Sequence, residues 1–433
     1  MAGFCYFPQT PEDIKAMLER IGVSSLDELY SDVPEEFVYK GEYDLPEALS
    51  EQQVRDYFQS LASKNARLKV FVGQGAYDHY VPAVIPYITS RSEFLTAYTP
   101  YQCEISQGTL RYIFEWQSMI CNLTGLDVSN ASMYDGPTAA AEAMRMCIAS
   151  RRKRGSVVVS KGLLPNVLAT IRTYAKYPGI KVVEAEDVVA ALNPDVAGVI
   201  VPGIDRNGAV CDLSGIADAV HSAGALMVEY CDPSTLAVLK TPAEWGADIA
   251  VGDGQSLGIP LCYGGPYVGF IACRQEHMRK LPGRIVGQTA DAAGRRSFVL
   301  TLQAREQHIR REKATSNICS NQSLMALWCT VYLSLMGPEG LRRVNELSSE
   351  RAHYLYDELL KTGKFCKIDD RPFIKEFVLR PLCDTARLQQ VLLDAGFFAA
   401  LETEDGNVTF CATEKCTYED IDTMIKVIRE AAL

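Results

Sequence analysis

Short β-rich runs alternate with helical stretches between residues 61 and 330, and this rhythm constrains the fold more than any other feature. Alternating strands and helices form a mostly parallel sheet that is covered by helices on both faces. The expected strands are 156–159, 181–183, 198–201, 226–230, 249–251 and 267–272. The expected helices are 108–124, 138–148, 164–174, 213–223 and 321–335.

The alternation ends at Gly337-Pro338-Glu339-Gly340, because glycine and proline interrupt regular structure. The segments beyond it predict a smaller α+β domain over 336–433, after a large α/β domain over 61–335. Its expected elements are a helix at 341–360, a strand at 373–379, a helix at 385–395, a strand at 407–411 and a helix at 418–432.

The first 60 residues predict a helical and extended arm. Thr10 is a suitable N-cap, Pro11 fits the first helical turn, and Asp13 completes a capping box. A second short helix is expected from Ser25, and the prolines at 34 and 46 favour extended chain. Such an arm more often wraps a neighbour than forms a core of its own.

Composition excludes several classes of protein. The 433-residue chain carries a net charge of −11, which argues against a general nucleic-acid binder. Its 14 cysteines form no C-x-x-C pair and its histidines number five, so neither a disulfide scaffold nor a metal site is expected. The N-terminus shows no signal peptide, and we expect no membrane span and a cytoplasmic protein.

Four long strings carry the most specific information. Residues 70–86 read VFVGQGAYDHYVPAVIP, and residues 130–142 read NASMYDGPTAAAE. Together with 94–128 and 280–322, they closely resemble subunit 1 of the two-subunit glycine decarboxylase family, the P-protein of the glycine cleavage system. The resemblance runs over nearly the whole chain and is densest in these blocks.

The resemblance implies a fold of the type I pyridoxal-phosphate-dependent transferases and a divided enzyme, glycine dehydrogenase (aminomethyl-transferring). Subunit 2 would hold pyridoxal phosphate, with none on this chain. The pair would decarboxylate glycine and pass the aminomethyl group to the lipoyl arm of H-protein. A 2+2 heterotetramer is the expected assembly, and this chain would support the site rather than catalyse alone.

An enzyme of this fold needs an aspartate for the pyridinium nitrogen and a lysine about two dozen residues later for the Schiff base. Asp232 follows the strand 226–230, but no lysine occurs from Thr241 through Arg279. Alignment on the Gly264-Gly265-Pro266 turn puts Gln255 in the lysine position, whereas alignment on the preceding strand points to Ser256. Neither side chain forms an imine, and we expect Asp232 to cap the turn that follows it.

The loop before the helix at 138–148 is where catalytic relatives bind the cofactor phosphate. Tyr134 and Asp135 occupy it here, and a carboxylate would cap the helix and repel phosphate. We therefore expect a self-capped helix and a degenerate cofactor position.

Four residues are candidates for lining the partner's active site, although most of their surroundings are expected to shape backbone and interface. They are Tyr98, Thr99, Tyr101 and Arg305. The basic run 303–313 is either a solvated face or a surface for acidic groups of the partner subunit or the lipoyl carrier. A self-sufficient pyridoxal-phosphate enzyme and a structural or regulatory binding protein are the alternative functions.

Overall fold

The computed structural model describes residues 8–96 and 98–432. The first seven residues of the expected arm therefore lie outside the described part. Contacts divide the chain into one unit that ends at Ala66 and a second that begins at Arg67. The expected boundary near residue 336 lies within the second unit and stays a prediction.

The first unit contains two amphipathic helices, α1 (Pro11–Ile21) and α2 (Glu51–Ala62), and two short 3-10 helices, η1 (Asp27–Tyr30) and η2 (Glu35–Phe37). Thr10 and Asp13 form the expected capping box at α1, and Ser50 with Gln53 forms another at α2. The sequence interpretation missed α2. None of residues 8–66 is buried, so the first unit does not cover the apolar stripes of its own two helices.

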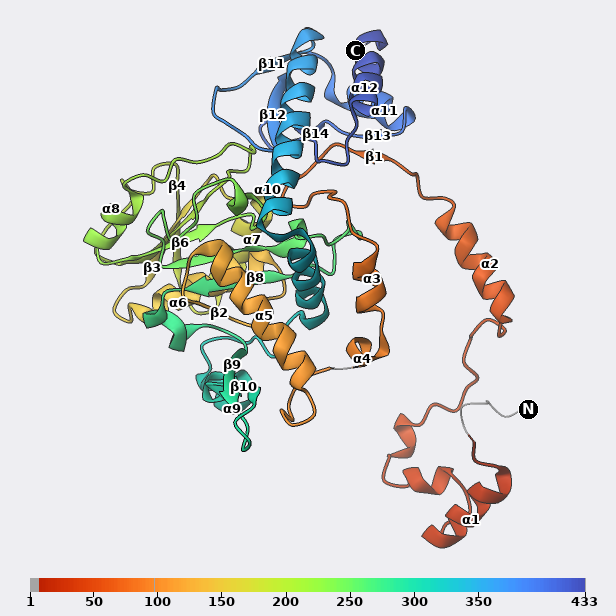
Figure 1. Cartoon of the computed structure of the whole chain (residues 1–433). Helices are drawn as coiled ribbons and strands as arrows, with labels where there is room; N and C mark the ends of the chain where they lie inside the picture. Colours follow the sequence, from red (N-terminus) through yellow and green to blue (C-terminus); the bar gives the residue numbers. More distant parts are fainter. Residues whose placement is uncertain (1–7, 97, 433) are drawn as a thin grey trace. The chain divides into compact units, whose positions relative to one another are not determined.

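A seven-stranded sheet organises the second unit (Figure 1). Its strand order is β2-β8-β7-β6-β5-β3-β4, and the five strands from β7 to β4 run parallel, while β8 is antiparallel to both of its neighbours. The expectation of a mostly parallel sheet is confirmed. The strands are β2 (Val128–Ser129), β3 (Ser156–Ser160), β4 (Lys181–Ala185), β5 (Val196–Pro202), β6 (Leu226–Tyr230), β7 (Ile249–Asp253) and β8 (Gly269–Cys273).

Helices cover both faces of this sheet because successive strand residues point to opposite sides. Val157 and Val159 pack with α6 (Gly136–Ser150) and α7 (Pro165–Lys176), whereas Val158 packs with α8 (Ile216–Ser222) on the other face. Farther along that second face, Ala250 and Phe270 pack against α5 (Gln107–Thr124) and the first half of α10 (Ser323–Lys361). The two-faced arrangement matches the sequence prediction.

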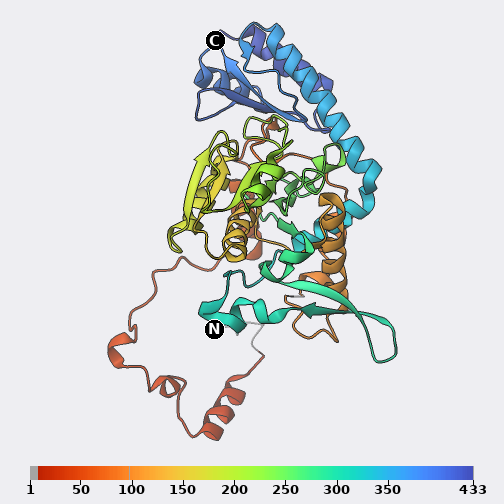
Figure 2. The ribbon, with the colours of Figure 1, turned by 90° about the vertical axis from the view of Figure 1, so that its left-hand side faces the viewer.

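The label α10 covers two helices that meet at Gly337, so the expected break in the helical pattern is confirmed there. Gly337 has φ of 59° and marks a kink between two helical halves. The first half of α10 packs beside the seven-stranded sheet. The second half packs against a second, four-stranded sheet near the C-terminus (Figures 1 and 2). Since glycine adopts this conformation readily, the Gly-Pro pair turns the chain and still lets the helix resume.

A four-stranded antiparallel sheet of order β11-β12-β15-β14 forms the second core with α11 (Thr385–Asp394) and α12 (Tyr418–Glu430). Its strands are β11 (Phe365–Lys367), β12 (Glu376–Pro381), β14 (Leu401–Glu402) and β15 (Val408–Cys411). Nearby, β1 (Lys69–Val70) pairs in parallel with β13 (Phe397–Phe398).

The segment 280–322 holds a hairpin that the sequence interpretation did not anticipate, with β9 (Ile285–Ala290) antiparallel to β10 (Arg296–Thr301). Short helical turns follow it. The remaining short helices of the second unit are α3 (Val84–Thr89), α4 (Ser92–Leu95), η3 (Thr235–Ala237), η4 (Gly254–Ser256), η5 (Gln275–Lys280), η6 (Gln303–Arg305), α9 (Gln307–Arg310) and η7 (Arg311–Lys313).

Among the described residues, α10 alone is long and apolar enough to cross a membrane by length and composition. The sequence interpretation overlooked this stretch, which carries no charged residue from 323 to 338. Core helices of globular domains pass the same test, and Ala326, Cys329 and Tyr332 of α10 are buried in the protein core. Packing in the core therefore accounts for part of the apolar character of α10, since 39% of its apolar window is buried.

Candidate functional site

Side chains from four parts of the second unit converge at the carboxyl ends of β6 and β7. Ligands of open α/β sheets bind at this edge. The cavity found there is small, about 40 Å³. Its lining includes Tyr77, Tyr230, Asp232, Asp253, Ser256 and Glu376.

Asp232, just beyond β6, forms an ion pair with the buried Lys375. The Lys375 Nζ lies 2.7 Å from the Asp232 Oδ2, and the two side chains are only 2% and 12% exposed. Asp232 also caps the following turn as expected, because its Oδ1 accepts from the backbone nitrogen and hydroxyl of Ser234, both at 3.0 Å. Burial opposes ionisation, but Lys375 and Ser256 outweigh it and hold the pKa of Asp232 below its ordinary value.

The ion pair is part of a buried chain of hydrogen bonds. The Lys375 Nζ donates to the His79 Nε2 at 3.0 Å, and the His79 Nδ1 lies 2.7 Å from the Glu414 Oε2. Since Lys375 donates to Nε2, His79 carries its proton on Nδ1 and donates it to Glu414. Lys375 also lies 4.0 Å from the centre of the Tyr77 ring. The ammonium group is therefore enclosed by acceptors and an aromatic face.

Gln255 and Ser256, the two candidates for the missing lysine position, point in different directions. The Gln255 amide is fully buried and bonds the Tyr77 backbone twice, at 2.7 and 2.8 Å, and the Ile259 carbonyl at 2.8 Å. Ser256 lines the cavity instead, and its hydroxyl donates to Asp232. The cavity side of this turn is therefore Ser256, while Gln255 holds the loop that carries Tyr77.

The amino end of α6 is capped by two carboxylates. The Asp135 Oδ1 accepts from the Thr138 nitrogen at 2.8 Å, and the Asp253 Oδ2 accepts from the Gly136 nitrogen at 2.9 Å. The self-capped helix is thus confirmed, and Tyr134 beside it is 36% exposed. Burial raises the pKa of Asp253 to about 7.

Glu376, the residue after Lys375, adds a further carboxyl group to the cavity. Its oxygens accept from the Gln74 nitrogen at 2.6 Å and the Tyr77 hydroxyl at 3.1 Å. Burial raises its pKa to about 7. The site therefore concentrates acidic groups where an anion would have to bind.

These residues do not fit pyridoxal phosphate. Cofactor pockets usually measure roughly 300–1,000 Å³, far more than the cavity of about 40 Å³. The amides at the start of α6 bind Asp135 and Asp253, and the Asp232 carboxylate binds Lys375. Among residues 8–96 and 98–432, these groups are therefore already engaged where a phosphate or a pyridinium nitrogen would bind.

The candidates for the partner site lie in another region, and the structure leaves their role a prediction. Tyr98 and Tyr101 are 77% and 65% exposed. The Thr99 hydroxyl is buried without a hydrogen-bond partner. The Arg305 guanidinium donates to the backbone carbonyls of Leu281 and, at 3.1 Å, Gly283. Arg305 therefore holds the start of β9 within this chain.

Two residues of the site, Lys375 and Glu376, were missed by the sequence interpretation. Lys375 and Glu376 fall inside the expected strand 373–379, where adjacent charged residues in a strand that enters the core were the available signal. That signal indicates burial with partners but not which partners. Only the folded chain shows that Lys375 meets Asp232.

Comparison with known proteins extends the similarity to almost the whole chain. The family model for the glycine cleavage system P-protein matches residues 5–428. Two relatives named "Probable glycine dehydrogenase (decarboxylating) subunit 1", from Carboxydothermus hydrogenoformans and Moorella thermoacetica, are each 45% identical. Each alignment covers 98% of this chain and 99% of the relative.

Solved structures agree. A crystal structure of glycine decarboxylase (P-protein) of the glycine cleavage system, in inhibitor-bound form, is 42% identical with a TM-score of 0.94, and the match covers 98% of this chain and 99% of that one. A glutamate decarboxylase from Lactobacillus brevis, 14% identical with a TM-score of 0.68 over 92% of this chain and 97% of that one, shares the fold alone. The expected fold class is confirmed, and the chain belongs to the glycine cleavage system P-protein family.

Proposed function

We propose that this chain is the cofactor-free subunit of a two-subunit glycine decarboxylase. A partner subunit would hold pyridoxal phosphate, and the complex would release carbon dioxide from glycine and transfer the aminomethyl group to the lipoyl arm of H-protein. The observation that carries this proposal is the ion pair between Lys375 and Asp232, because Lys375 occupies the carboxylate that the pyridinium nitrogen of a cofactor would meet. This chain's contribution is support of the partner's fold and site.

The apolar surface of the first unit supports a permanent partner. In α2, Val54, Tyr57, Phe58 and Leu61 recur at helical spacing and are 38%, 55%, 61% and 37% exposed. Large apolar patches on a stable protein mark interaction sites. We propose that the cofactor-bearing subunit covers this stripe in a 2+2 heterotetramer.

The surface near the start of β9 supports a role at the partner's site. The buried Arg284 guanidinium lies 5.6 Å from the centre of the exposed Tyr101 ring. Arg310, Arg311 and Lys313 are exposed farther along the same segment. We propose that Tyr98 and Tyr101 reach toward the partner's active site, and that the basic residues meet acidic groups of the partner or of H-protein.

Co-expression tests the proposal. This chain and a cofactor-bearing subunit of the same family should copurify and exchange bicarbonate into glycine in the presence of H-protein. This chain alone should show neither exchange nor the visible absorbance of an aldimine with pyridoxal phosphate. Full exchange activity of the partner without this chain would contradict the supporting role.

A further inference from the structure

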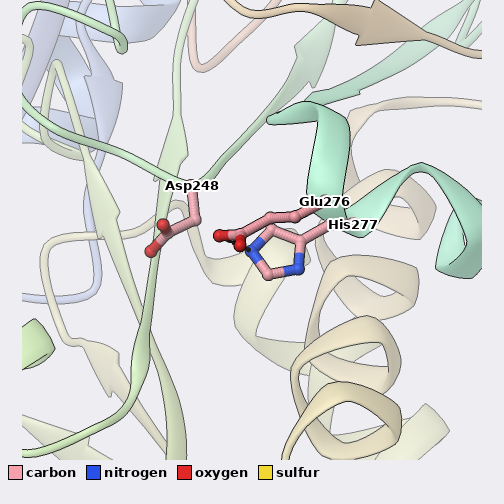
Figure 3. A group of neighbouring side chains, drawn as sticks. All are labelled: Asp248, Glu276 and His277. Carbon is pink, nitrogen blue, oxygen red and sulfur yellow. Dashed lines mark ion pairs between the residues drawn. The ribbon is translucent and has the colours of Figure 1, made fainter.

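A second group of chemically active side chains lies at the other end of β7, where that strand begins. Asp248 immediately precedes β7, so it stands at the amino end of the strand whose carboxyl end holds Asp253. Glu276 and His277 come from η5, directly after β8 (Figure 3). The cavity around Asp232 is not involved.

One candidate ligand atom from each of the three side chains lies within 4.8 Å of the other two. The His277 Nε2 and the Glu276 Oε1 are 3.3 Å apart. Ligands that share a tetrahedral metal with bonds of about 2.0–2.2 Å lie at roughly this separation. The Glu276 side chain is 71% exposed and free to adjust toward Asp248.

His277 provides an independent reason to look for a ligand. It is 5% exposed, and its buried Nε2 makes no hydrogen bond, although the Glu276 Oε1 lies 3.3 Å away. Buried polar atoms normally have partners, so this nitrogen calls for one.

Hydrogen bonds from neighbouring groups fix the orientation of the Asp248 carboxylate. Its Oδ2 accepts from the Met227 nitrogen at 2.8 Å and lies 2.8 Å from the His221 Nε2. Outer hydrogen bonds of this kind orient metal-binding carboxylates. Arg274 is the nearest opposing charge, with its Nε 3.7 Å from the Asp248 Oδ1, but the same Nε donates to the Ala247 carbonyl at 3.2 Å.

We propose that Asp248, Glu276 and His277 bind a divalent first-row transition metal, with zinc as the representative ion. One imidazole and two carboxylates are a nitrogen and oxygen set that suits such ions, and the two carboxylates balance the metal charge. Asp248 and His277 already stand in position to bind the ion, and the exposed Glu276 side chain moves toward it. The site runs against the sequence-based expectation of no metal, which rested on the scarcity of histidine.

The test is zinc binding by the full-length chain, measured by equilibrium dialysis with metal analysis after a chelator wash. We expect one zinc per chain, lost in His277→Ala. His221→Ala removes only the outer hydrogen bond and should weaken binding about 10–100-fold. His353→Ala is the matched control, since the exposed His353 stacks on Phe373 at 4.1 Å, away from the proposed site, and the change should leave binding unchanged.

Cobalt replaces zinc to identify the ligand atoms, because Cys262 and Cys319 are exposed free thiols that could bind metal themselves. We expect weak visible bands without the intense near-ultraviolet charge-transfer absorption of thiolate ligands. Thiolate absorption, no stoichiometric zinc in the wild-type chain, or equal binding by His277→Ala would each overturn the proposal.

Discussion

Replacing Lys375 with methionine tests whether the ion pair with Asp232 holds the site together. The change leaves the nearly buried Asp232 carboxylate without its cation, and it removes the donor to the His79 Nε2 and the Ser234 hydroxyl, at 3.0 and 3.2 Å. Breaking a buried pair from one side costs about 3–5 kcal/mol. We expect a loss of that size in the free energy of unfolding at neutral pH.

The second partner provides the internal control. The double variant Lys375→Met, Asp232→Asn removes both charges and should recover most of the loss, because a neutral pair leaves no buried charge. The surface pair of Lys367 and Asp370, 57% and 84% exposed, is the external control. Lys367→Met should cost less than about 1 kcal/mol.

The loss should also depend on pH in a defined direction. The folded-state pKa of Asp232 is lowered in the wild type, so its contribution is present above the unfolded pKa, roughly 3.9, and is lost as pH falls through the folded value. In Lys375→Met, burial acts alone and raises that pKa. The gap between variant and wild type should therefore shrink as pH falls toward 4.

Urea unfolding followed by circular dichroism at several pH values measures all four chains. A loss below about 1 kcal/mol for Lys375→Met, with no recovery in the double variant, would refute the reasoning. So would a gap that widens at low pH.

Two further predictions concern the site in the second unit, and a third concerns the N-terminal arm. Glu376→Gln should gain stability relative to wild type as pH rises from 4.5 to about 7, because in that range the Glu376 carboxyl ionises only in the unfolded wild-type chain. The difference in the free energy of unfolding should reach about 3 kcal/mol, measured from unfolding curves of both proteins at each pH. Gln255→Lys should give no imine absorbance with pyridoxal phosphate and should lower the melting temperature, since the amide faces the Tyr77 backbone rather than the cavity. Deleting residues 1–66 should abolish copurification with the partner subunit while the circular dichroism of the remaining unit is retained; an intact complex would exclude the arm as the interface.

The large sheet could be read from the sequence because its strands are short apolar runs with helices between them. The strand 226–230 was placed without error, and the expected helix at 108–124 begins one residue late. The sequence interpretation missed several elements, among them α2 and the β9–β10 hairpin. The capping box at Ser50 was available as a signal for α2, whereas β10 begins with the charged Arg296 and its strand pattern is weak.

The site was predictable only where local chemistry decides it. Asp135 caps a helix that begins next to it, and the missing lysine is visible in the sequence itself. Lys375 lies far along the chain, immediately before β12, and no local pattern pairs it with Asp232. The directions of Gln255 and Ser256 likewise depend on which side of a 3-10 turn faces the cavity.

The most direct test of the central claim is the location of pyridoxal phosphate in the assembled complex. The complex is loaded with stoichiometric cofactor, reduced with borohydride, digested, and mapped by mass spectrometry. We expect a pyridoxyl group on one lysine of the partner subunit and none on this chain. A stoichiometric pyridoxyl adduct on Lys375, or on any other lysine of this chain, would contradict the account.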